Sequence, residues 1–425
     1  MRAYSKKVEL KMQSDPQRVF MIGWEYPPHN SGGLGVACAG MTKALAGKHT
    51  DIHFALPYHH DEMVSHMHVL DCSDPSWFSS DPTLRFQPPL GVYETGTLIA
   101  TTPDGNTDTE RMRLLPQSEI ERKVAEYADQ VVQKGSAIKQ QFDVIHAHDW
   151  MSLPAAADLR QKTGKPMIAH IHSTEFDRAA LQTGNQMITQ IEKAGMEAAD
   201  QIIAVSYYTK RLLTDRYGIA ANKISVVHNG IDPIAFAPPI VPAFAPKRPV
   251  VAYMGRLTVQ KGIEYFLSVA RKVVEKVPNA LFVVAGSGDM YHELLFRSAY
   301  DQLSALVLFS GFLRDSQRER LLERADVFMM PSISEPFGLV ALEAAQRHTP
   351  VIVSKNAGVG EVLPGAVAVD FWDVDVMAAT VTQLLTSSSA HAKQVSAQLA
   401  DVQKLTWGKA ADQISSVYRK AFLGK

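Results

Sequence analysis

Apolar and polar residues follow one another in this chain as short apolar runs separated by longer amphipathic stretches. In the first half, the runs predict buried strands and the stretches predict helices. The predicted strands cover residues 18–23, 51–56, 142–146, 166–171, 201–205 and 223–228. The predicted helices cover residues 34–46, 118–140, 154–162, 186–199 and 209–217. This alternation indicates a parallel sheet with helices on both faces.

The same alternation restarts behind a proline-rich stretch, residues 233–249, which we interpret as a linker. The strands predicted after it cover residues 249–254, 280–285, 305–309, 326–330 and 351–353. The helices predicted there cover residues 263–277, 290–303, 314–324 and 339–345, with further helices to the C-terminus. We therefore predict an α/β protein of two doubly wound, Rossmann-like domains, residues 1–232 and 250–425, facing each other across a cleft. The C-terminal helix is a candidate to pack back on the first domain.

The composition narrows the class of protein. A chain of 425 residues is long enough for two domain cores, and its formal net charge of −1 gives no sign of a nucleic-acid surface. Two cysteines, Cys38 and Cys72, make neither a disulfide framework nor a zinc pattern. Charged residues such as Arg2 and Lys6 precede the first apolar run, so we expect no signal peptide and no transmembrane segment. We predict a cytoplasmic protein, and leave peripheral membrane contact and oligomeric state open.

Two stretches of the first domain fall outside the regular pattern. Six histidines lie between residues 49 and 68, without the carboxylate or cysteine partners that catalytic metal sites recruit. We favour a loop beside a substrate cleft over a metal site there. Residues 71–106 are rich in Pro, Ser, Asp and Gly, and predict an insertion with irregular structure or a hairpin.

A candidate ligand site lies between residues 330 and 344. Glu335 precedes a proline, which favours an extended loop conformation, whereas the residues after Gly338 are good helix formers. Glu343 then lies within the helix, and the free N–H groups of the helix N-terminus lie between the two carboxylates. This arrangement predicts an anion site flanked by acids, suited to a nucleoside diphosphate sugar. The alternative is a core helix with one exposed acid and one capping acid.

Cationic residues and glycines that could contribute to this site follow other strands of the second domain. Arg256 and Lys261 follow its first strand, and two permanent positive charges at a helix N-terminus suit a diphosphate. The alternative is a pair of solvated loop cations. Gly286 lies in a glycine turn after the second strand, and Gly311 lies in another after the third. All of these loops converge on one edge of the predicted sheet.

In the first domain, Gly32 and Gly33 precede a helix, and glycines there let the backbone approach a ligand. A plain tight turn is the alternative. Polar and aromatic residues also follow two predicted strands. They are His146, His148, Asp149, Trp150, His172, Ser173, Thr174 and Glu175. For His172 we favour ligand contact over a core position, because ligands of such sheets lie beyond the carboxyl ends of the strands.

Together these motifs resemble the retaining nucleotide-sugar glycosyltransferases of family 4, which have the GT-B fold. The motifs are Gly255-Arg256-Leu257, Lys261-Gly262, Glu335-Pro336-Phe337-Gly338 with Glu343, Gly32-Gly33-Leu34-Gly35, His146-Ala147-His148-Asp149-Trp150 and Ile171-His172-Ser173. Their order is similar to that in the glycogen and starch synthase branch. The resemblance runs from about Arg18 to the C-terminal helix, where Thr406-Trp407 also fits.

The resemblance implies specific roles for these residues. Arg256 and Lys261 would bind the donor diphosphate, Glu335 would contact the transferred sugar, and His172 would lie near its carbon-six hydroxyl. Glu343 would hold the ribose hydroxyls. The remaining residues implied in donor binding are Gly33, Gly286, Phe337, Gly338 and Leu339. The candidates on the acceptor side are His148, Asp149 and Trp150. No cofactor and no metal would be required.

The sequence thus predicts a retaining, metal-independent hexosyltransferase that moves a hexose, glucose by preference, from a nucleoside diphosphate sugar to a saccharide acceptor. Bacterial glycogen synthases usually carry a lysine two positions before the glycine pair, where this chain has Asn30. That difference weakens the case for ADP-glucose as donor and glycogen as product. The alternatives are a family 4 transferase making a cell-envelope glycan, glycolipid or small glucoside, a sugar-nucleotide epimerase, and a non-catalytic binding protein.

Overall fold

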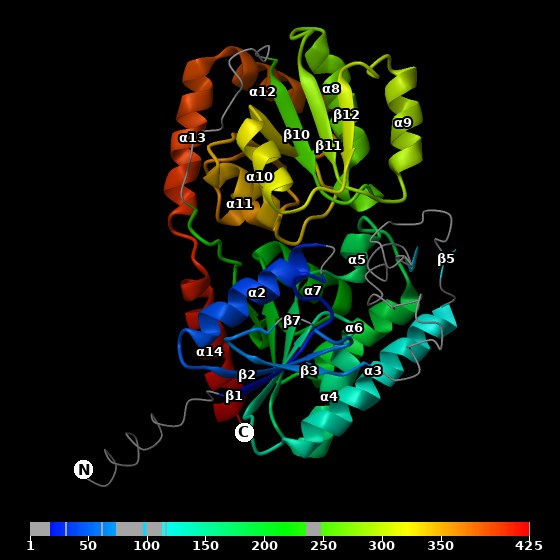
Figure 1. Cartoon of the computed structure of the whole chain (residues 1–425), viewed down its shortest axis with the longest axis vertical. Coiled ribbons are helices and arrows are strands. Elements are labelled where there is room, and N and C mark those ends of the chain that lie inside the picture. Colours follow the sequence, from blue (N-terminus) through cyan, green and yellow to red (C-terminus); the bar gives the residue numbers. More distant parts are fainter. Residues whose placement is uncertain are drawn as a thin grey trace, which may run out of the picture.

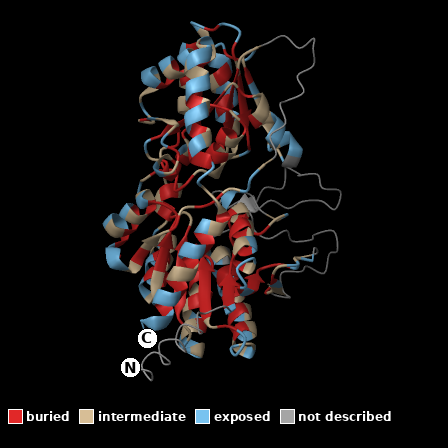
Figure 2. Cartoon of the chain, turned by 90° about the vertical axis from the view of Figure 1, so that its left-hand side faces the viewer, coloured by how far each residue is buried: buried red, intermediate tan, exposed pale blue. Residues whose placement is uncertain are grey.

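The computed structural model describes residues 18–29, 32–60, 63–73, 97–98, 113–114, 117–234 and 248–424. Two α/β domains lie one above the other, each built on a parallel sheet (Figure 1). The buried residues concentrate in the strands of both sheets and in the helix faces that cover them (Figure 2). The predicted two-domain Rossmann-like architecture is therefore confirmed.

The N-terminal domain contains a seven-stranded parallel sheet in the order β3-β2-β1-β6-β7-β8-β9. Its strands are β1 (Arg18–Ile22), β2 (Asp51–Leu56), β3 (His68–Asp71), β6 (Val144–His148), β7 (Met167–Ile171), β8 (Gln201–Ala204) and β9 (Ile224–Val226). Its helices are α2 (Gly33–Ala46), α3 (Gln117–Ala137), α4 (Leu153–Thr163), α5 (Glu175–Arg178), α6 (Gln186–Ala198), α7 (Tyr207–Tyr217) and η4 (Ala221–Lys223). One face of the sheet packs on α3, α4, α6 and α7.

The C-terminal domain contains a six-stranded parallel sheet in the order β12-β11-β10-β13-β14-β15. Its strands are β10 (Val250–Met254), β11 (Leu281–Ala285), β12 (Val307–Gly311), β13 (Val327–Met330), β14 (Val351–Ser354) and β15 (Val367–Val369). Its helices are η5 (Val259–Lys261), α8 (Ile263–Val274), α9 (Tyr291–Tyr300), α10 (Asp315–Arg324), α11 (Leu339–Gln346), η6 (Gly358–Glu361), α12 (Val374–Thr386) and α13 (Ser388–Val402). One core lies under α8, α9 and α12, and the other under α10, α11 and α13.

The last helix, α14 (Trp407–Leu423), packs with α2 on the second face of the N-terminal sheet (Figure 1). Two glycines make room for Trp407 at its start. A Cβ at Gly230 would lie 2.2 Å from the Trp407 backbone nitrogen, and one at Gly40 would lie 2.2 Å from the Trp407 ring. The chain therefore crosses between the domains twice, first near Gly230 and again just before Trp407.

Most predicted elements agree with the structure to within a few residues, and three differences have a physical cause. The strand predicted at 142–146 runs from Val144 to His148, because both histidines of this segment are buried in the sheet. Strand β3 was not predicted, because its histidine reads as polar although His53 and His68 stack at 4.9 Å. Strand β15 was not predicted either, since a three-residue edge strand is too short to show periodicity.

Two predicted segments are only partly within the described residues. Of the insertion 71–106, the structure describes its start and β4 (Thr97–Leu98), which pairs antiparallel with β5 (Arg113–Leu114). Most of the linker, and Asn30, lie outside the described residues. Among the helices of the described ranges, none is both long and apolar enough to cross a membrane.

Candidate active site

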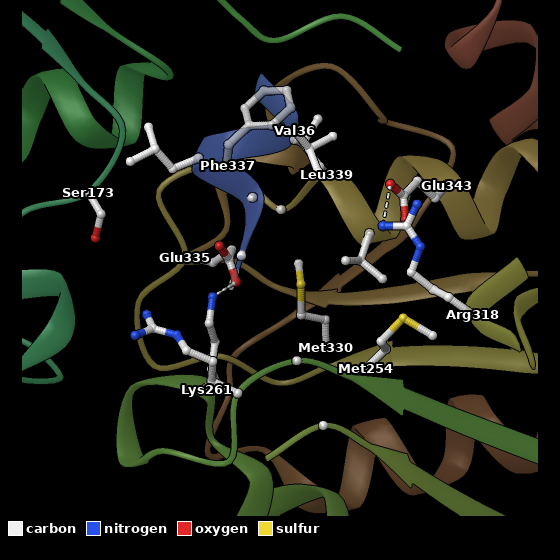
Figure 3. Close-up of a pocket in the computed structure, with 18 of the residues that line it drawn as sticks. Val36, Ser173, Met254, Lys261, Arg318, Met330, Glu335, Phe337, Leu339 and Glu343 are labelled. Carbon is white, nitrogen blue, oxygen red and sulfur yellow. Dashed lines mark hydrogen bonds and ion pairs between the residues drawn. The ribbon is translucent and has the colours of Figure 1, made fainter. Parts of the chain in front are cut away.

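A cavity of about 460 Å³ lies between the two domains, where the carboxyl ends of both sheets face each other. Its walls come from the loops after β1, β6 and β7 on one side, and from those after β10, β11, β12 and β13 on the other. Figure 3 shows Ser173 of the N-terminal domain opposite Lys261 and Glu335 of the C-terminal domain. The position of this cavity is the one expected for the ligand site of two facing α/β domains.

The loop after β10 is joined to the loop after β13 by a close backbone approach. Gly262 has φ +62°, and a Cβ there would lie 2.1 Å from the carbonyl oxygen of Pro331. The backbone carbonyl of Gln260 accepts a hydrogen bond from the Ile333 N–H at 2.9 Å. The Gln260 side chain, itself buried, donates to the Ser334 carbonyl oxygen at 3.2 Å. Only glycine fits this approach, which fixes the cation loop against the glutamate loop.

The two loops place Lys261 and Glu335 in direct contact. Lys261 Nζ lies 2.6 Å from Glu335 Oε2, and their side chains are 17% and 9% exposed (Figure 3). A charge pair with so little solvent access is held more firmly than a surface pair, and removing one partner leaves the other charge buried. The pair therefore presents a fixed ammonium and a fixed carboxylate to the cavity.

Gly338 starts helix α11 at the cavity wall. Its φ of +105° is unfavourable for any residue with a side chain, and a Cβ there would lie 3.3 Å from Glu335 Cγ. The first N–H groups of the helix have no intrahelical acceptor, and they lie at the cavity wall. Phe337, Gly338 and Leu339 all line the cavity. This helix end provides the positive electrostatic environment that an anionic ligand needs.

Glu343 lines the cavity farther along α11, where its carboxylate meets Arg318 of α10. Arg318 Nη1 lies 3.4 Å from Glu343 Oε1, and Figure 3 shows this pair on the other side of Met330 from the Lys261–Glu335 pair. Burial raises the pKa of Glu343, and the charges of Arg318 and Arg347 oppose that rise. Glu343 Oε2 is buried and has no hydrogen-bond partner in the described part of the chain. A buried acceptor at a cavity wall is suited to a ligand hydroxyl.

Arg256 lies on the same wall, beside the glycine turn after β11. Its backbone carbonyl accepts a hydrogen bond from the buried Tyr253 hydroxyl at 2.7 Å, and its Nη2 donates to Gln260 Oε1 at 3.2 Å. Gly286 has φ +141°, and a Cβ there would lie 1.8 Å from the Gly255 carbonyl oxygen. The turns after β10 and β11 can therefore pack together only with glycine at this position.

On the N-terminal side, Asp149 adopts a left-handed backbone conformation, with φ +59°. Its Oδ1 accepts hydrogen bonds from the backbone N–H groups of His172 at 2.6 Å and Ser173 at 3.3 Å. These bonds hold the loop after β7 against the end of β6 and compensate for the unfavourable φ. Burial raises the pKa of Asp149 to about 7, although these two bonds oppose the rise.

His172 lines the cavity beside Asp149, whereas two other predicted residues do not. His148 Nδ1 lies 3.1 Å from His172 Nε2, so His148 contacts the cavity residue from behind. Burial lowers the pKa of His172 to about 3, and its ring is therefore neutral at physiological pH. His148 and Trp150 are fully buried and outside the cavity wall. Of the three predicted acceptor-side residues, only Asp149 reaches the cavity.

The remaining predicted donor-binding residue, Gly33, lies at the start of α2. A Cβ there would lie 3.9 Å from Leu339 Cδ1 across the domain boundary, so the helix N-termini of both domains meet at the cavity. The structure thus brings Gly33, His172, Arg256, Lys261, Glu335 and Glu343 to one cavity, together with Gly286 and the start of α11.

Several cavity residues were missing from the sequence prediction. Glu25 after β1, Gln260 in the cation loop and Arg318 in the first turns of α10 all line the cavity. Arg318 had a usable signal, because it lies early in the helix predicted at 314–324, directly after the glycine turn that contains Gly311. Gln260 lies between Arg256 and Lys261, and its role in joining the two loops depends on long-range contacts that spacing does not reveal.

One group of side chains has the composition of a metal site. The ring nitrogens of His146, His148 and His170 offer ligand atoms within 4.8 Å of one another, and all three residues are buried. However, His146 Nε2 lies 3.1 Å from His170 Nδ1 in nearly parallel rings, and His146 Nδ1 lies 2.8 Å from the Tyr418 hydroxyl. Both His146 nitrogens and His170 Nδ1 are thus in hydrogen bonds, whereas His148 Nε2 and His170 Nε2 have no hydrogen-bond partner in the described residues.

Two family descriptions match this chain and together cover most of it. Residues 97–234 match "Glycosyltransferase Family 4", and residues 240–401 match "Glycosyl transferases group 1". The fold and the cavity between its two domains thus define a glycosyltransferase of the GT-B class. The chain belongs to the family 4 glycosyltransferases, as its motifs indicated.

Comparison with individual proteins agrees with this assignment. A glycogen synthase of Mycobacterium tuberculosis is 27% identical over 440 residues, which cover 96% of each chain. The sucrose-phosphate synthase of Thermosynechococcus elongatus has a similar fold, with a TM-score of 0.75 at 20% identity over 96% of this chain and all of that one. Anabaena HepE, solved in complex with UDP-glucose, gives a TM-score of 0.65 at 16% identity over 93% of this chain and 98% of that one.

Proposed function

We propose that this glycosyltransferase moves a hexose, glucose by preference, from a nucleoside diphosphate sugar to a saccharide acceptor, with retention of anomeric configuration. The observation that carries the proposal is the position of Glu343. It offers a buried, unpartnered Oε2 at one end of a cavity whose other end holds Lys261 paired with Glu335. An acceptor atom at one end and a charge pair at the other suit a ligand with a diol, a diphosphate and a sugar in that order.

In this proposal, each part of the ligand is bound by different cavity residues. Glu343 accepts hydrogen bonds from the ribose hydroxyls, and the N-terminus of α11 with Arg256 and Lys261 binds the diphosphate. Glu335 and His172 face the sugar from opposite domains. Two of the relatives named above are named for glycogen and sucrose phosphate, which contain glucose, and the third was solved in complex with UDP-glucose. These names support glucose as the first candidate.

The proposed reaction breaks the bond between the sugar's carbon one and the phosphate oxygen as the acceptor oxygen bonds to the same face of that carbon. The departing phosphate oxygen takes the acceptor's proton. Negative charge that builds on the leaving diphosphate is stabilised by Arg256, Lys261 and the helix dipole of α11. These groups supply positive charge themselves, so we propose that no metal ion is required. The acceptor enters from the N-terminal side, past Asp149 and Glu25. We place this reaction in the cytoplasm.

The decisive experiment measures the release of UDP, ADP and GDP from a panel of donor sugars, with and without maltooligosaccharides. We expect one nucleotide to be released faster when the acceptor is present, and the product to keep the anomeric configuration of the donor. Inversion at carbon one would refute the proposed mechanism. Incorporation of solvent protons into the donor sugar without transfer would instead identify the protein as an epimerase.

A further inference from the structure

Four histidines form two hydrogen-bonded pairs on one face of the N-terminal sheet. His146 and His148 belong to β6, while His170 and His172 lie in β7 and just past its end. Residues two apart in a strand point to the same face, so the histidines of β6 and β7 share the face of Val144 and Ile168, which pack under α2 and α14. The pairs are His146 with His170 and His148 with His172, each with a nitrogen–nitrogen distance of 3.1 Å.

Each pair contains one buried ring nitrogen without a hydrogen-bond partner among the described residues. His148 Nε2 and His170 Nε2 are buried, and neither has a hydrogen-bond partner in the described ranges. A neutral imidazole carries one proton, so each ring has one N–H donor and one bare nitrogen acceptor. All four rings are held neutral, because burial lowers the pKa of each of them.

This arrangement decides where the protons lie. If His148 carried its proton on Nε2, a buried N–H would have no acceptor. Orphaned buried N–H groups are rarer in proteins than under-satisfied acceptors, and leaving a buried group unpaired costs about 1–3 kcal/mol. The favoured tautomer of His148 therefore has its proton on Nδ1, and that N–H donates to His172 Nε2. His172 Nε2 is then an acceptor, which leaves the proton of this ring on Nδ1.

We propose that His148 is a positioning residue that fixes His172 as its Nδ1–H tautomer, so that His172 offers a hydrogen-bond donor to the sugar in the cavity. Within the described residues, His172 makes its ring hydrogen bond through Nε2, its Nδ1 has no hydrogen-bond partner, and the residue lines the cavity. His172 thus binds a hydroxyl oxygen and takes no proton from the acceptor. The role in catalysis rests on the proposed hexosyl transfer, whereas the tautomer itself does not.

The tautomer can be measured in the intact protein without any substrate. Imidazole nitrogen NMR of ¹⁵N-histidine-labelled protein distinguishes protonated from bare ring nitrogens, and a His172→Gln variant assigns the signal. We expect His172 to carry its proton on Nδ1 at neutral pH. A proton on Nε2 would overturn the proposal, whether or not the protein transfers sugar.

Two substitutions of His148 distinguish the effect of its N–H donor from the effect of its side-chain volume. His148→Asn keeps an amide N–H near the position of Nδ1, whereas His148→Phe keeps a ring and loses the donor. We expect His148→Phe to shift the His172 proton towards Nε2 and to lower kcat/KM roughly tenfold, the value of about one hydrogen bond. We expect His148→Asn to retain the Nδ1–H signal and to stay within roughly threefold of the parent. If both variants lose the same amount of activity, His148 acts only through packing.

A matched control tests whether any disturbance of this buried face has the same effect. Tyr418→Phe on α14 removes the hydrogen bond to His146 of β6 but leaves the His148–His172 pair intact. We expect no change in the His172 tautomer and no change in kcat/KM.

A donor sugar that lacks the carbon-six hydroxyl provides a further test. The parent should prefer the complete sugar over this donor, and His148→Phe should lose that preference. An unchanged preference in His148→Phe would contradict the proposal.

Discussion

Ser334, the residue before Glu335, donates a hydrogen bond of 2.5 Å from its Oγ to Asp177 Oδ1 in the other domain. Tyr208, also of the N-terminal domain, has its hydroxyl 2.7 Å from the same Ser334 oxygen. Both Ser334 and Asp177 are completely buried. The position of the Glu335 loop therefore depends directly on contact between the domains.

The first prediction concerns this contact. Ser334→Ala should lower the turnover rate about threefold to tenfold. A hydrogen bond to a charged group contributes about 1.5–3 kcal/mol, and we expect its loss to displace the Glu335 loop for part of the time. Steady-state kinetics with the donor that the nucleotide-release panel selects measure the change. Ser298→Ala is the control, since Ser298 is also buried but bonds only within α9. Equal losses in the two variants would contradict a role for the domain contact.

The second prediction concerns the pair between Lys261 and Glu335. Lys261→Ala should reduce transfer by about 100-fold or more, because it removes charge from the leaving group and leaves the Glu335 carboxylate buried and unpaired. Glu335→Gln should be less harmful to the fold but similarly harmful to turnover. Lys355→Ala provides the control, since Lys355 makes a comparable ion pair of 2.7 Å with Asp370 at the surface. A rate for Lys261→Ala within tenfold of the parent would refute the site assignment.

The third prediction concerns Glu343 and the ribose. Glu343→Gln should weaken nucleotide binding roughly tenfold, because an uncharged amide accepts weaker hydrogen bonds than a carboxylate does. The parent should also discriminate against a deoxyribose nucleotide, and the variant should not. Isothermal titration of the free nucleoside diphosphate measures both effects. Glu323→Gln on α10, where the Glu323 carboxylate lies 3.8 Å from Arg347 Nε, serves as the control. Discrimination that survives in Glu343→Gln would place the ribose elsewhere.

The fourth prediction follows from the raised pKa of Asp149. Its ordinary pKa of 3.8 becomes about 7 in the fold, so the folded protein keeps a proton that the unfolded chain loses between these values. The free energy of unfolding should therefore fall as the pH rises from about 4 to about 7, by at most ~1.4 kcal/mol per pH unit. Asp149→Asn should lack this dependence while still accepting the backbone N–H of His172. Denaturant unfolding of both proteins across this range gives the difference, and a constant difference would contradict the prediction.

The fifth prediction concerns metal ions. Because the cavity offers the diphosphate Arg256, Lys261 and a helix N-terminus, treatment with EDTA should leave the transfer rate within about twofold of the untreated enzyme. Added Mg²⁺ should likewise have little effect. A loss of activity that only a divalent ion restores would show that the protein cations are insufficient.

The fold was largely predictable from sequence because parallel sheets bury both of their faces, which produces continuous apolar runs such as Val250–Met254. The strand ends then located Arg256, Lys261 and Glu335 on one edge. His148 and Trp150 were placed on the acceptor side because they follow an apolar run, but β6 extends to His148 and buries it. Polar residues buried through contacts with distant segments leave no periodic signal, as His146 does when it bonds Tyr418.

The contacts between the two domains were the part of the site that could not be predicted from the sequence. Nothing about Ser334 or Asp177 alone indicates a partner 157 positions away. Gly286 was recognisable as a turn glycine and Gly262 as part of a motif, but the carbonyl groups that they approach could not be predicted. Such contacts depend on how two independently predictable domains dock, which local patterns do not encode.

The packing of α14 on the N-terminal sheet also constrains how the protein is made. Ile414, Val417 and Tyr418 complete a core whose other members, such as Met21 and Phe54, are synthesised hundreds of residues earlier. While the ribosome is still making the second domain, the first has one face of its sheet without this cover, and exposed apolar surface at that stage favours aggregation. Biogenesis of the N-terminal domain therefore finishes only after translation has reached α14.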